Sequence, residues 1–413
     1  MIVAQILRKY DPAQWGGTES AVKQLADGLA SQGVSSRFFA PKLPREPQLD
    51  PLAAAGHRVN RYRAFVPVAR IKPEQREQLI SIGGNLMSFD LLWKLWREPD
   101  LNVIHTHTAN RIGGIALAVA RRRGLPSVIT IHGGALDIPQ AVKDALVKPL
   151  EGGIEWGKIF GAPLRSRHVL HDANAIVTCN PREAGLLRQK FPSKRILVQP
   201  HGVTISAYHG EHRPAAAAAF PQIVGRDVLL VLGRIDPVKN QGFVLQHINE
   251  ILRRYSECIL VFAGACTDES YGKALKKEIE RSGLEKRVFF TGGIPPGDVR
   301  LIGLLQSAKV VVVPSLSETF GLVILEAWAA GTPVVSSRTS GALSLVEPNK
   351  NGWLFDLAEP SQFLSALDEA LANPSKAKQF AAAGHDLAAR EYDTAILARH
   401  IRNLYEELIQ DAA

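Results

Sequence analysis

The stretch SETFGLVILEAWAAGTPVV, residues 317–335, decides the architecture of this 413-residue chain. It holds a nearly continuous apolar segment that contains two carboxylates, Glu318 and Glu326, and it ends in a β-branched run. The strand-like sequence KVVVVPS comes just before it. Strand, loop, helix and strand in this order are the unit of a parallel sheet, so we expect a helix over about residues 320–330.

Working outward, short β-branched runs alternate with longer amphipathic stretches along the whole chain. The first series of strand-like runs is IVAQIL, NVIHTH, SVITIHG, AIVTCN and ILVQPHG, and the second is DVLLVLGRID, CILVFAGA, VFFTGG, KVVVVPS, TPVVSSR and GWLF. Continuous apolar strands of this kind are buried on both faces by helices. A chain of this length also exceeds the size of a usual single core. The predicted fold class is therefore α/β, with two Rossmann-like, doubly wound parallel-sheet domains.

The domain boundaries follow from the same pattern. We expect an N-terminal domain over residues 1–205 and a C-terminal domain over residues 206–392, with a linker near residues 205–225, where Ala, Pro and polar residues lack a clear period. The last segment, about residues 393–413, is a strongly amphipathic helix with no strand after it. It could cross back onto the first domain.

Composition excludes several classes of protein. No apolar run reaches the roughly 18 residues that a membrane span needs, and the N-terminus lacks the basic region of a signal peptide. Three cysteines without CxxC spacing support neither a disulfide framework nor a zinc site. These features predict a cytoplasmic protein. Its net charge of +9 is uneven: residues 1–200 hold 28 Lys+Arg against 16 Asp+Glu, a net +12, which leaves 21 against 24, a net −3, for residues 201–413.

In open α/β sheets ligands bind at the loops that follow the strands. After the first strand, Gly16 and Gly17 precede a helix whose N–H groups could reach an anion, although a plain tight turn is the alternative. The absence of G-x-G-x-x-G there disfavours a dehydrogenase. Arg234 and Lys239 follow the first strand of the second series and suit a diphosphate, with solvated surface charge as the alternative. His132 directly follows another strand and is either a site residue or a structural histidine.

The spacing of the two carboxylates constrains their use. Along mostly helical backbone, Glu318 and Glu326 would lie roughly 12 Å apart. That is wider than the roughly 5–9.5 Å between the paired carboxylates of glycosidases, which disfavours hydrolysis. The span fits the ribose and the sugar of a nucleotide sugar whose diphosphate lies between them. The alternative is that Glu318 caps the helix and Glu326 points to solvent.

Other features of the first half concern partners. For His105 and His107 we expect buried hydrogen-bonding roles. Basic clusters in RYRAFVPVARIK, RRRG and LRSRH are either solvated surface or a field that attracts anions. For Trp93 and Trp96 in LLWKLWREPD we expect packing inside the domain, with an interfacial helix at a membrane as the alternative.

Together these stretches resemble the retaining family-4 glycosyltransferases of the GT-B fold, over nearly the whole chain. PSLSETFGLVILEAWAAGTPVV is similar to the Glu-x7-Glu signature of that family, GRIDPVKNQG to its diphosphate loop, and GGTE and TIHGG to its N-terminal donor loops. The resemblance implies two domains facing across a cleft. It also implies transfer of a sugar from a nucleotide-diphosphate sugar, UDP- or GDP-linked, to an acceptor hydroxyl in glycan, glycolipid or cell-surface polysaccharide synthesis.

The resemblance also implies roles for individual residues. Arg234 and Lys239 would neutralise the leaving diphosphate, Glu318 would lie beside the donor sugar, and His132 would contact that sugar near its reacting carbon. The residues implied in binding the nucleotide sugar are Gly16, Gly17, Gly233, Thr291, Ile294, Phe320, Gly321, Leu322 and Glu326. Among these, Gly17 would donate its amide to the diphosphate, Thr291 and Ile294 would lie near the base, and Glu326 would bind the ribose. The chain departs from the family at His201-Gly202-Val203-Thr204 and at Ser340-Gly341.

Cofactors and partners complete the expectation. The chain has no Asp-x-Asp, the usual carboxylate pair for a metal-bound diphosphate, so we expect neither a metal nor another cofactor. The expected acceptor is a sugar, a lipid-linked molecule or an anion, with peripheral contact to an anionic membrane through the basic N-terminal domain and no nucleic-acid partner. Alternatives are a nucleotide-sugar 2-epimerase or sugar phosphorylase of the same architecture, and a non-catalytic nucleotide-sugar-binding protein.

Overall fold

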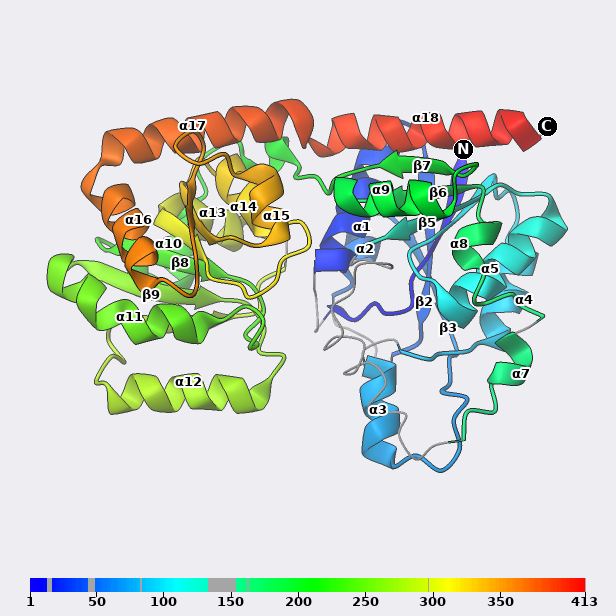
Figure 1. Ribbon diagram of the computed structural model, residues 1–413, viewed down its shortest axis with the longest axis horizontal. Coiled ribbons are helices and arrows are strands. Elements are labelled where there is room, and N and C mark those ends of the chain that lie inside the picture. The colour runs from blue at the N-terminus through cyan, green and yellow to red at the C-terminus, as the bar shows by residue number, and fades with distance from the viewer. Residues whose placement is uncertain are drawn as a thin grey trace. The chain divides into compact units, whose positions relative to one another are not determined.

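A computed structural model of the protein describes residues 1–12, 17–43, 49–81, 84–132, 154–161, 163–295 and 297–412. Contacts divide the chain into two compact units (Figure 1). The first unit comprises Met1–Pro12, Leu25–Pro200 and Leu397–Ala413, and the second comprises Ala13–Gln24 and His201–Ile396. The end of the last helix therefore belongs with the strands of the first unit.

The first unit is built on a seven-stranded sheet in the order β3-β2-β1-β4-β5-β6-β7, in which all paired strands are parallel. Its strands are β1 (Ile2–Ile6), β2 (Ser35–Pro41), β3 (Arg58–Tyr62), β4 (Val103–Thr106), β5 (Ser127–Ile131), β6 (Ala175–Thr178) and β7 (Arg195–Val198). The helices are α1 (Gly17–Ala30), α2 (Pro51–Ala54), α3 (Pro73–Ser81), α4 (Phe89–Arg97), α5 (Asn110–Arg123), α7 (Lys158–Gly161), α8 (Val169–Asp172), α9 (Pro181–Lys190) and α18 (Thr394–Ala412).

The two faces of this sheet are buried by different helices. Alternate residues such as Ala4, Ile104 and Ile129 pack in one core with apolar residues of α4 and α5. The residues between them, such as Val3 and Val103, pack in a second core with α18. A doubly covered sheet needs apolar side chains on both faces, which is why its central strands are continuous apolar runs.

The second unit has a six-stranded parallel sheet in the order β10-β9-β8-β11-β12-β13. Its strands are β8 (Asp227–Leu232), β9 (Cys258–Ala263), β10 (Val288–Gly292), β11 (Ala308–Val313), β12 (Val334–Ser337) and β13 (Trp353–Phe355). The helices are η3 (Ile205–Tyr208), α10 (Arg213–Ala219), η4 (Pro221–Ile223), α11 (Gln241–Arg254), α12 (Glu269–Arg281), α13 (Val299–Ser307), α14 (Leu322–Ala329), α15 (Ser340–Leu345), α16 (Pro360–Ala372) and α17 (Pro374–Glu391).

The segment of residues 205–225 was predicted to be a linker, and that prediction is wrong because the segment is folded. It forms η3, α10 and η4, and α10 packs against α13. A Cβ atom on Gly303 of α13 would lie 2.0 Å from the backbone oxygen of His212, so the glycine allows this close approach. The run of alanines after a proline at the first helical turn forms a short helix that is part of the second unit.

Each sheet contains a point where the direction of strand addition reverses. In the first sheet it lies between β1 and β4, and in the second between β8 and β11. The loops that follow the two strands at such a point diverge and leave room for a ligand. The fold therefore directs attention to the carboxyl ends of these strands.

Within the part of the chain that the structure describes, no helix has both the length and the apolarity needed to cross a membrane.

Candidate functional site

An ion pair bridges the reversal point of the second sheet. Lys239 lies in the loop after β8, Glu318 lies in the loop after β11, and the ammonium of Lys239 donates to the carboxylate of Glu318. Both side chains are mostly buried. The two motifs that sequence analysis singled out separately therefore meet, because the strands that carry them are neighbours in the sheet.

Backbone contacts hold these two loops together. The N–H of Leu316 donates to the oxygen of Val238 at 2.8 Å, and the amide of Asn240 donates to the oxygen of Pro314 at 3.1 Å. The start of the cationic loop, at Gly233, also packs closely against Gly264, which follows the neighbouring strand β9. A Cβ on Gly264 would lie 2.0 Å from the backbone oxygen of Gly233. Only a residue without a side chain fits there, and the cationic loop is thereby fixed at the strand ends.

Arg234 has a partner that sequence analysis missed. Its guanidinium lies 3.1 Å from the carboxylate of Asp236, which also accepts the backbone N–H of Lys239 at 3.0 Å. The side chain of Arg234 remains 44% exposed, whereas that of Asp236 is 10% exposed. Asp236 thus holds the loop that presents both cations. Its position between them in GRIDPVKNQG was the available signal.

The loop that carries Glu318 is fixed from the next strand along the sheet. The backbone oxygen of Glu318 accepts the N–H of Gly341 at 2.8 Å and the hydroxyl of Ser340 at 3.0 Å. A Cβ on Gly341 would lie 2.5 Å from the backbone carbon of Phe320, so a larger residue would displace the loop. Where the family commonly has a Gly-Gly pair, this chain has Ser340-Gly341. The second glycine, which packs against the Glu318 loop, is therefore retained.

Helix α14 begins at Leu322, two residues later than expected, with Gly321 as its N-cap in the left-handed region at φ 95°. Gly321 has no side chain to cap the helix, and in the described part of the chain the carboxylate of Glu318 bonds to Lys239 and Ser315 rather than to a helix N–H. Glu326 is 8% exposed and does not point to solvent. Burial raises the pKa of its carboxyl to about 7, against the opposing effect of Lys239. The alternative that sequence analysis left open for the two carboxylates is therefore wrong.

The remaining residues predicted for the donor lie in the same unit. Thr291 and Ile294 lie at and after the end of β10, and both are half-buried. The hydroxyl of Thr291 donates to the backbone oxygen of Gly292 at 2.9 Å. Phe320 is buried against the rings of His201 and Tyr392. All of these follow strands of one sheet or precede α14.

His132 belongs to the first unit, where it directly follows β5. Its Nε2 lies 2.9 Å from Nδ1 of His107, and Nε2 of His107 lies 2.8 Å from the side-chain oxygen of Gln5. His105 is fully buried and bonds to Thr130 at 2.6 Å. The buried hydrogen-bonding roles expected for His105 and His107 are therefore confirmed, and Gln5 is a member that sequence analysis missed.

Of the two glycines predicted after the first strand, Gly17 is the first residue of α1 and Gly16 lies outside the described residues.

The prediction for the tryptophans was wrong. Trp93 and Trp96 of α4 are 53% and 45% exposed. Helix α4 buries Leu91 and Leu95 instead, so its second apolar side faces outward. A pattern with two apolar sides does not tell which of them the domain will cover.

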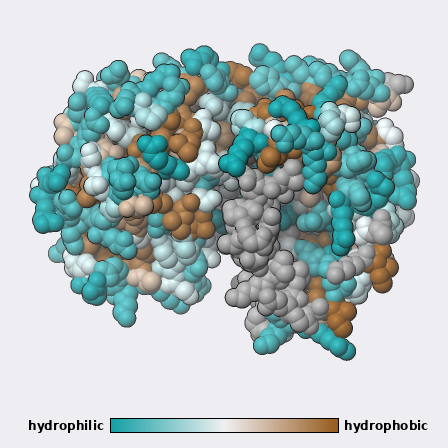
Figure 2. Space-filling model, in the orientation of Figure 1, coloured by the Kyte–Doolittle hydropathy of each residue, from teal (hydrophilic) through white to brown (hydrophobic). Residues whose placement is uncertain are grey.

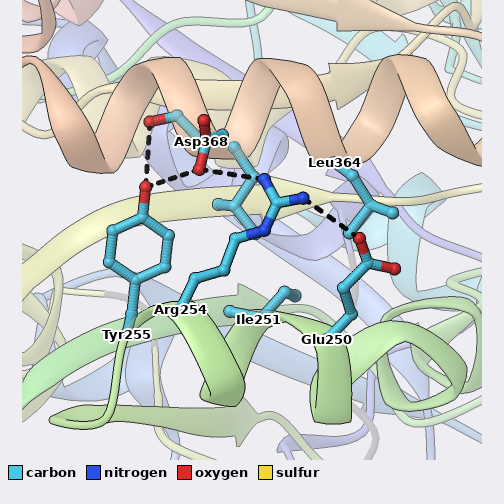
Figure 3. Close-up of a pocket in the computed structure, with 7 residues that line it drawn as sticks. Glu250, Ile251, Arg254, Tyr255, Leu364 and Asp368 are labelled. Atoms are coloured by element: carbon cyan, nitrogen blue, oxygen red, sulfur yellow. Dashed lines mark hydrogen bonds and ion pairs between the residues drawn. The ribbon is translucent and has the colours of Figure 1, made fainter.

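A separate small pocket lies between α11 and α16, and its polar groups pair with one another (Figure 3). Arg254 bridges Glu250 and Asp368 at 3.4 and 3.3 Å, and the hydroxyl of Tyr255 donates to Asp368 at 2.7 Å. None of the predicted site residues lines it. In the described ranges no three His, Cys, Asp or Glu side chains are arranged to hold a metal ion.

Comparisons with known proteins match both halves of the chain. Residues 216–386 match the family Glycosyl transferases group 1, and residues 16–202 match the Glycosyl transferase 4-like domain. The D-inositol 3-phosphate glycosyltransferase of Frankia alni is 28% identical and covers 96% of each chain. The alpha-D-kanosaminyltransferase of Streptomyces kanamyceticus is 24% identical over 94% of this chain and 98% of its own. The crystal structure of Anabaena HepE in complex with UDP and glucose has a TM-score of 0.72 at 17% identity, covering 98% of this chain and all of that one.

The family matches and the likeness in fold agree with the two parallel-sheet units and with the predicted motifs. Both family matches are to glycosyltransferases, and together they cover each of the two units. The chain belongs to the family-4 glycosyltransferases with the GT-B fold.

Proposed function

We propose that this glycosyltransferase transfers a sugar, with retention and without a metal, from a nucleotide-diphosphate sugar to an acceptor hydroxyl. The observation that carries the proposal is the pair of cations, Lys239 and Arg234, held at the reversal point of the second sheet. Helix α14 begins at the same edge and adds the positive end of its dipole. Two fixed cations and a helix N-terminus suit the charge of a diphosphate.

In the proposed reaction the diphosphate takes over both cations. Lys239 leaves the carboxylate of Glu318 and binds a phosphate oxygen. Arg234 likewise leaves the carboxylate of Asp236 and binds a phosphate oxygen. The charge that develops on the diphosphate as the glycosidic bond breaks is then stabilised by groups already in place. Glu318, released from Lys239, accepts a hydrogen bond from a hydroxyl of the donor sugar.

The bonds that change lie at the reacting carbon of the sugar. Its bond to the phosphate oxygen breaks, and a bond to the acceptor oxygen forms on the same face. The acceptor's proton moves to the leaving phosphate oxygen, so no side chain is assigned as general base. Because Arg234 and Lys239 supply the positive charge, and the sequence lacks Asp-x-Asp, the step needs no metal.

Glu326 is proposed to bind the ribose. It lies in the second turn of α14, one turn into the helix from the diphosphate end. Burial raises its pKa to about 7, so near neutral pH the carboxyl is available in both forms to hydrogen-bond a pair of hydroxyls.

The named relatives support a nucleotide-sugar donor. HepE has been solved with UDP-glucose and with UDP and glucose, and the Frankia relative is named for transfer to D-inositol 3-phosphate. We therefore expect a UDP- or GDP-linked donor and an anionic acceptor, which agrees with the net +12 of residues 1–200.

The test begins with thermal stabilisation by UDP, GDP, ADP, TDP and the corresponding monophosphates. The matching sugar donors are then incubated with and without inositol phosphates, and the products are analysed by NMR for anomeric configuration. Stabilisation by one diphosphate, followed by transfer with retention, is expected. An inverted product would refute retention, conversion of the donor to its 2-epimer would favour an epimerase, and binding without turnover would favour a binding protein.

A second proposal concerns the surface of the protein that contacts the membrane from which an acceptor would come. The exposed side of α4 carries Phe89, Trp93 and Trp96. The ring of Phe89 also contacts the rings of Phe65 and Phe160. Figure 2 shows that apolar and hydrophilic surface lie side by side on the visible face of the first unit. We call Phe89, Trp93 and Trp96 the outer face of α4.

Basic side chains border this face. The guanidinium of Arg97 lies over the ring of Trp93 at 4.2 Å, Arg63 is exposed, and Lys94 is partly exposed beside Asp90. Aromatic rings flanked by cations fit the interface of an anionic bilayer. We propose that the outer face of α4 docks there.

Flotation with anionic and neutral vesicles at low and high salt tests this. Binding to anionic vesicles that falls with salt and is lost in Trp93→Ser/Trp96→Ser is expected. Val299→Ser, which removes an exposed apolar side chain of α13 in the second unit, is the matched control. If the wild type does not bind vesicles, the proposed membrane docking is refuted, and the acceptor is then a freely diffusing molecule.

A further inference from the structure

A band of hydrogen-bonded polar side chains crosses the first sheet beneath α18. It contains Gln5 on β1, His105 and His107 at the end of β4, Thr130 and His132 at the end of β5, and Tyr405 on α18. Among these, only His132 has an expected role at the site, the contact with the donor sugar that the family resemblance implies. The other members are almost completely buried, in a sheet face that is mostly apolar.

Gln5 determines the direction of the hydrogen bonds toward His132. Its side-chain oxygen lies 2.8 Å from Nε2 of His107 and can only accept, so that nitrogen carries the proton. In a neutral imidazole the other nitrogen then has a lone pair. Nδ1 of His107 faces Nε2 of His132 at 2.9 Å, and His132 must therefore donate from Nε2. Nδ1 of His132 is left as an acceptor.

The contacts on the other side of the band agree with this orientation of Gln5, whose amide nitrogen also donates to the hydroxyl of Ser36 at 3.4 Å. The side-chain amide of Gln5 donates to the hydroxyl of Tyr405. Nδ1 of His105 lies 2.5 Å from the hydroxyl of Tyr405, and Nε2 lies 2.6 Å from the hydroxyl of Thr130. With Tyr405 donating to Nδ1, Nε2 of His105 carries the proton and donates to Thr130. Every bond has one donor and one acceptor in this arrangement. Burial lowers the pKa of His105 to about 3, which keeps this part of the band neutral.

We propose that Gln5 and Tyr405 are positioning residues that hold His132 in the tautomer with the proton on Nε2 and a lone pair on Nδ1. In this tautomer Nδ1 can accept a hydrogen bond, for example from a hydroxyl, and cannot donate one. That this hydroxyl belongs to the donor sugar rests on the proposed function, whereas the tautomer itself does not. The C-terminal helix thus contributes to the state of a residue nearly three hundred positions earlier in the chain.

Nitrogen-15 NMR of the imidazole side chains tests the tautomer in the full-length, ligand-free protein. The His132 signals are assigned by their loss in His132→Asn. In the wild type we expect Nε2 to show the shift of a protonated nitrogen and Nδ1 that of a lone-pair nitrogen. In Gln5→Leu the acceptor for His107 is removed, and both tautomers of His132 should be populated.

A pair of buried tyrosines supplies the matched control. Tyr405→Phe removes the group that orients Gln5 and should alter the His132 signals. Tyr62→Phe removes a hydroxyl that is equally buried in the same unit but donates to the backbone oxygen of Leu7 at 2.7 Å. Both changes should lower stability by similar amounts, and only Tyr405→Phe should move His132. Tyr405→Phe also tests the proposal if Gln5→Leu does not fold.

The opposite tautomer in the wild type, or unchanged His132 signals in both Gln5→Leu and Tyr405→Phe, would overturn the proposal. Turnover decides the separate question of function. Loss of one oriented hydrogen bond in the transition state should lower kcat about tenfold in Tyr405→Phe, with KM changed much less. If the tautomer changes and kcat does not, the positioning role stands and the proposed contact of His132 with the sugar fails.

Discussion

The two units hold their candidate site residues in opposite ways. In the second unit Arg234 and Lys239 are charged and paired with carboxylates, at loops that follow strands. In the first unit the band from Gln5 to His132 consists of side chains that are joined by hydrogen bonds. We propose that a ligand replaces the carboxylates of these charged pairs, so that each cation stays paired. The band in the first unit keeps one arrangement, because a buried polar group without its partner is costly.

This difference suggests a division of tasks. A leaving diphosphate changes its charge during the reaction, so its partners must be charged and already in place. A sugar hydroxyl does not change its charge, and recognising it requires only a fixed donor or acceptor. The predictions below test this division, beginning with the largest effect.

The cations of the second unit should matter most. Arg234→Ala or Lys239→Ala should weaken nucleoside diphosphate binding by roughly 10- to 100-fold, because a charge-assisted hydrogen bond contributes about 1.5–3 kcal/mol. Turnover should fall by about 100-fold or more, since the charge on the leaving group grows in the transition state. Calorimetry and steady-state kinetics measure the two effects. Arg254→Ala removes an exposed, ion-paired arginine of the same unit and serves as control; wild-type turnover in both site variants would contradict the proposal.

The two carboxylates should separate binding from turnover. Glu318→Gln should mainly lower kcat, because in the proposed reaction Glu318 is released from Lys239 toward the reacting sugar. Glu326→Gln should mainly raise the Kd of the nucleotide by weakening contact with the ribose. Each effect is expected to be about tenfold, the value of one hydrogen bond to a charged group. Equal defects in kcat and Kd for the two variants would show that they do not occupy different ends of the ligand.

Gly341→Ala tests whether the Glu318 loop is fixed by packing. The added methyl group would lie 2.5–2.7 Å from backbone atoms of Phe320, so the loop must move. We expect the free energy of unfolding to fall by about 1–3 kcal/mol in urea denaturation. Gly185→Ala in α9, where nothing lies within 4 Å, is the control and should be neutral or slightly stabilising. Equal stability of the two variants would mean that the close packing at Gly341 is not needed.

Glu326 should make stability depend on pH. Its folded-state pKa of about 7 lies above the ordinary value of 4.5, so the folded protein binds the extra proton between these values. Stability should therefore fall as pH rises from about 4.5 to 7 and stay level above, with a loss of about 1–3 kcal/mol from this group. Glu326→Gln should remove that slope and be more stable than the wild type at pH 8. Thermal unfolding across pH measures it, and parallel curves for both proteins would refute the shifted pKa.

The smallest expected effect is that of metal removal. If Arg234 and Lys239 supply the positive charge as proposed, activity with excess EDTA should equal that without it. A magnesium titration of the EDTA-treated enzyme is the control. Loss of activity in EDTA that magnesium restores would show that the two cations do not suffice.

Part of the fold was predictable because its signal is local. The apolar runs of β1, β4, β5, β8, β9 and β11 are each readable alone, since a strand buried on both faces must be apolar throughout. The edge strand β3, RVNRY, and its neighbour β2 were not among the predicted strands. The segment of residues 205–225 and the outer face of α4 were misjudged, because local sequence does not say which neighbour will cover an apolar side.

The sequence by itself therefore determined the fold class, the position of the cationic loop and the two carboxylates, and the family. Only the tertiary structure decided which of these residues meet. Lys239 and Glu318 are 79 positions apart, and His105 and Tyr405 are 300 apart. Such pairs depend on the order of strands in each sheet and on the helix that covers it, and these are set by burial over the whole domain rather than by any local pattern.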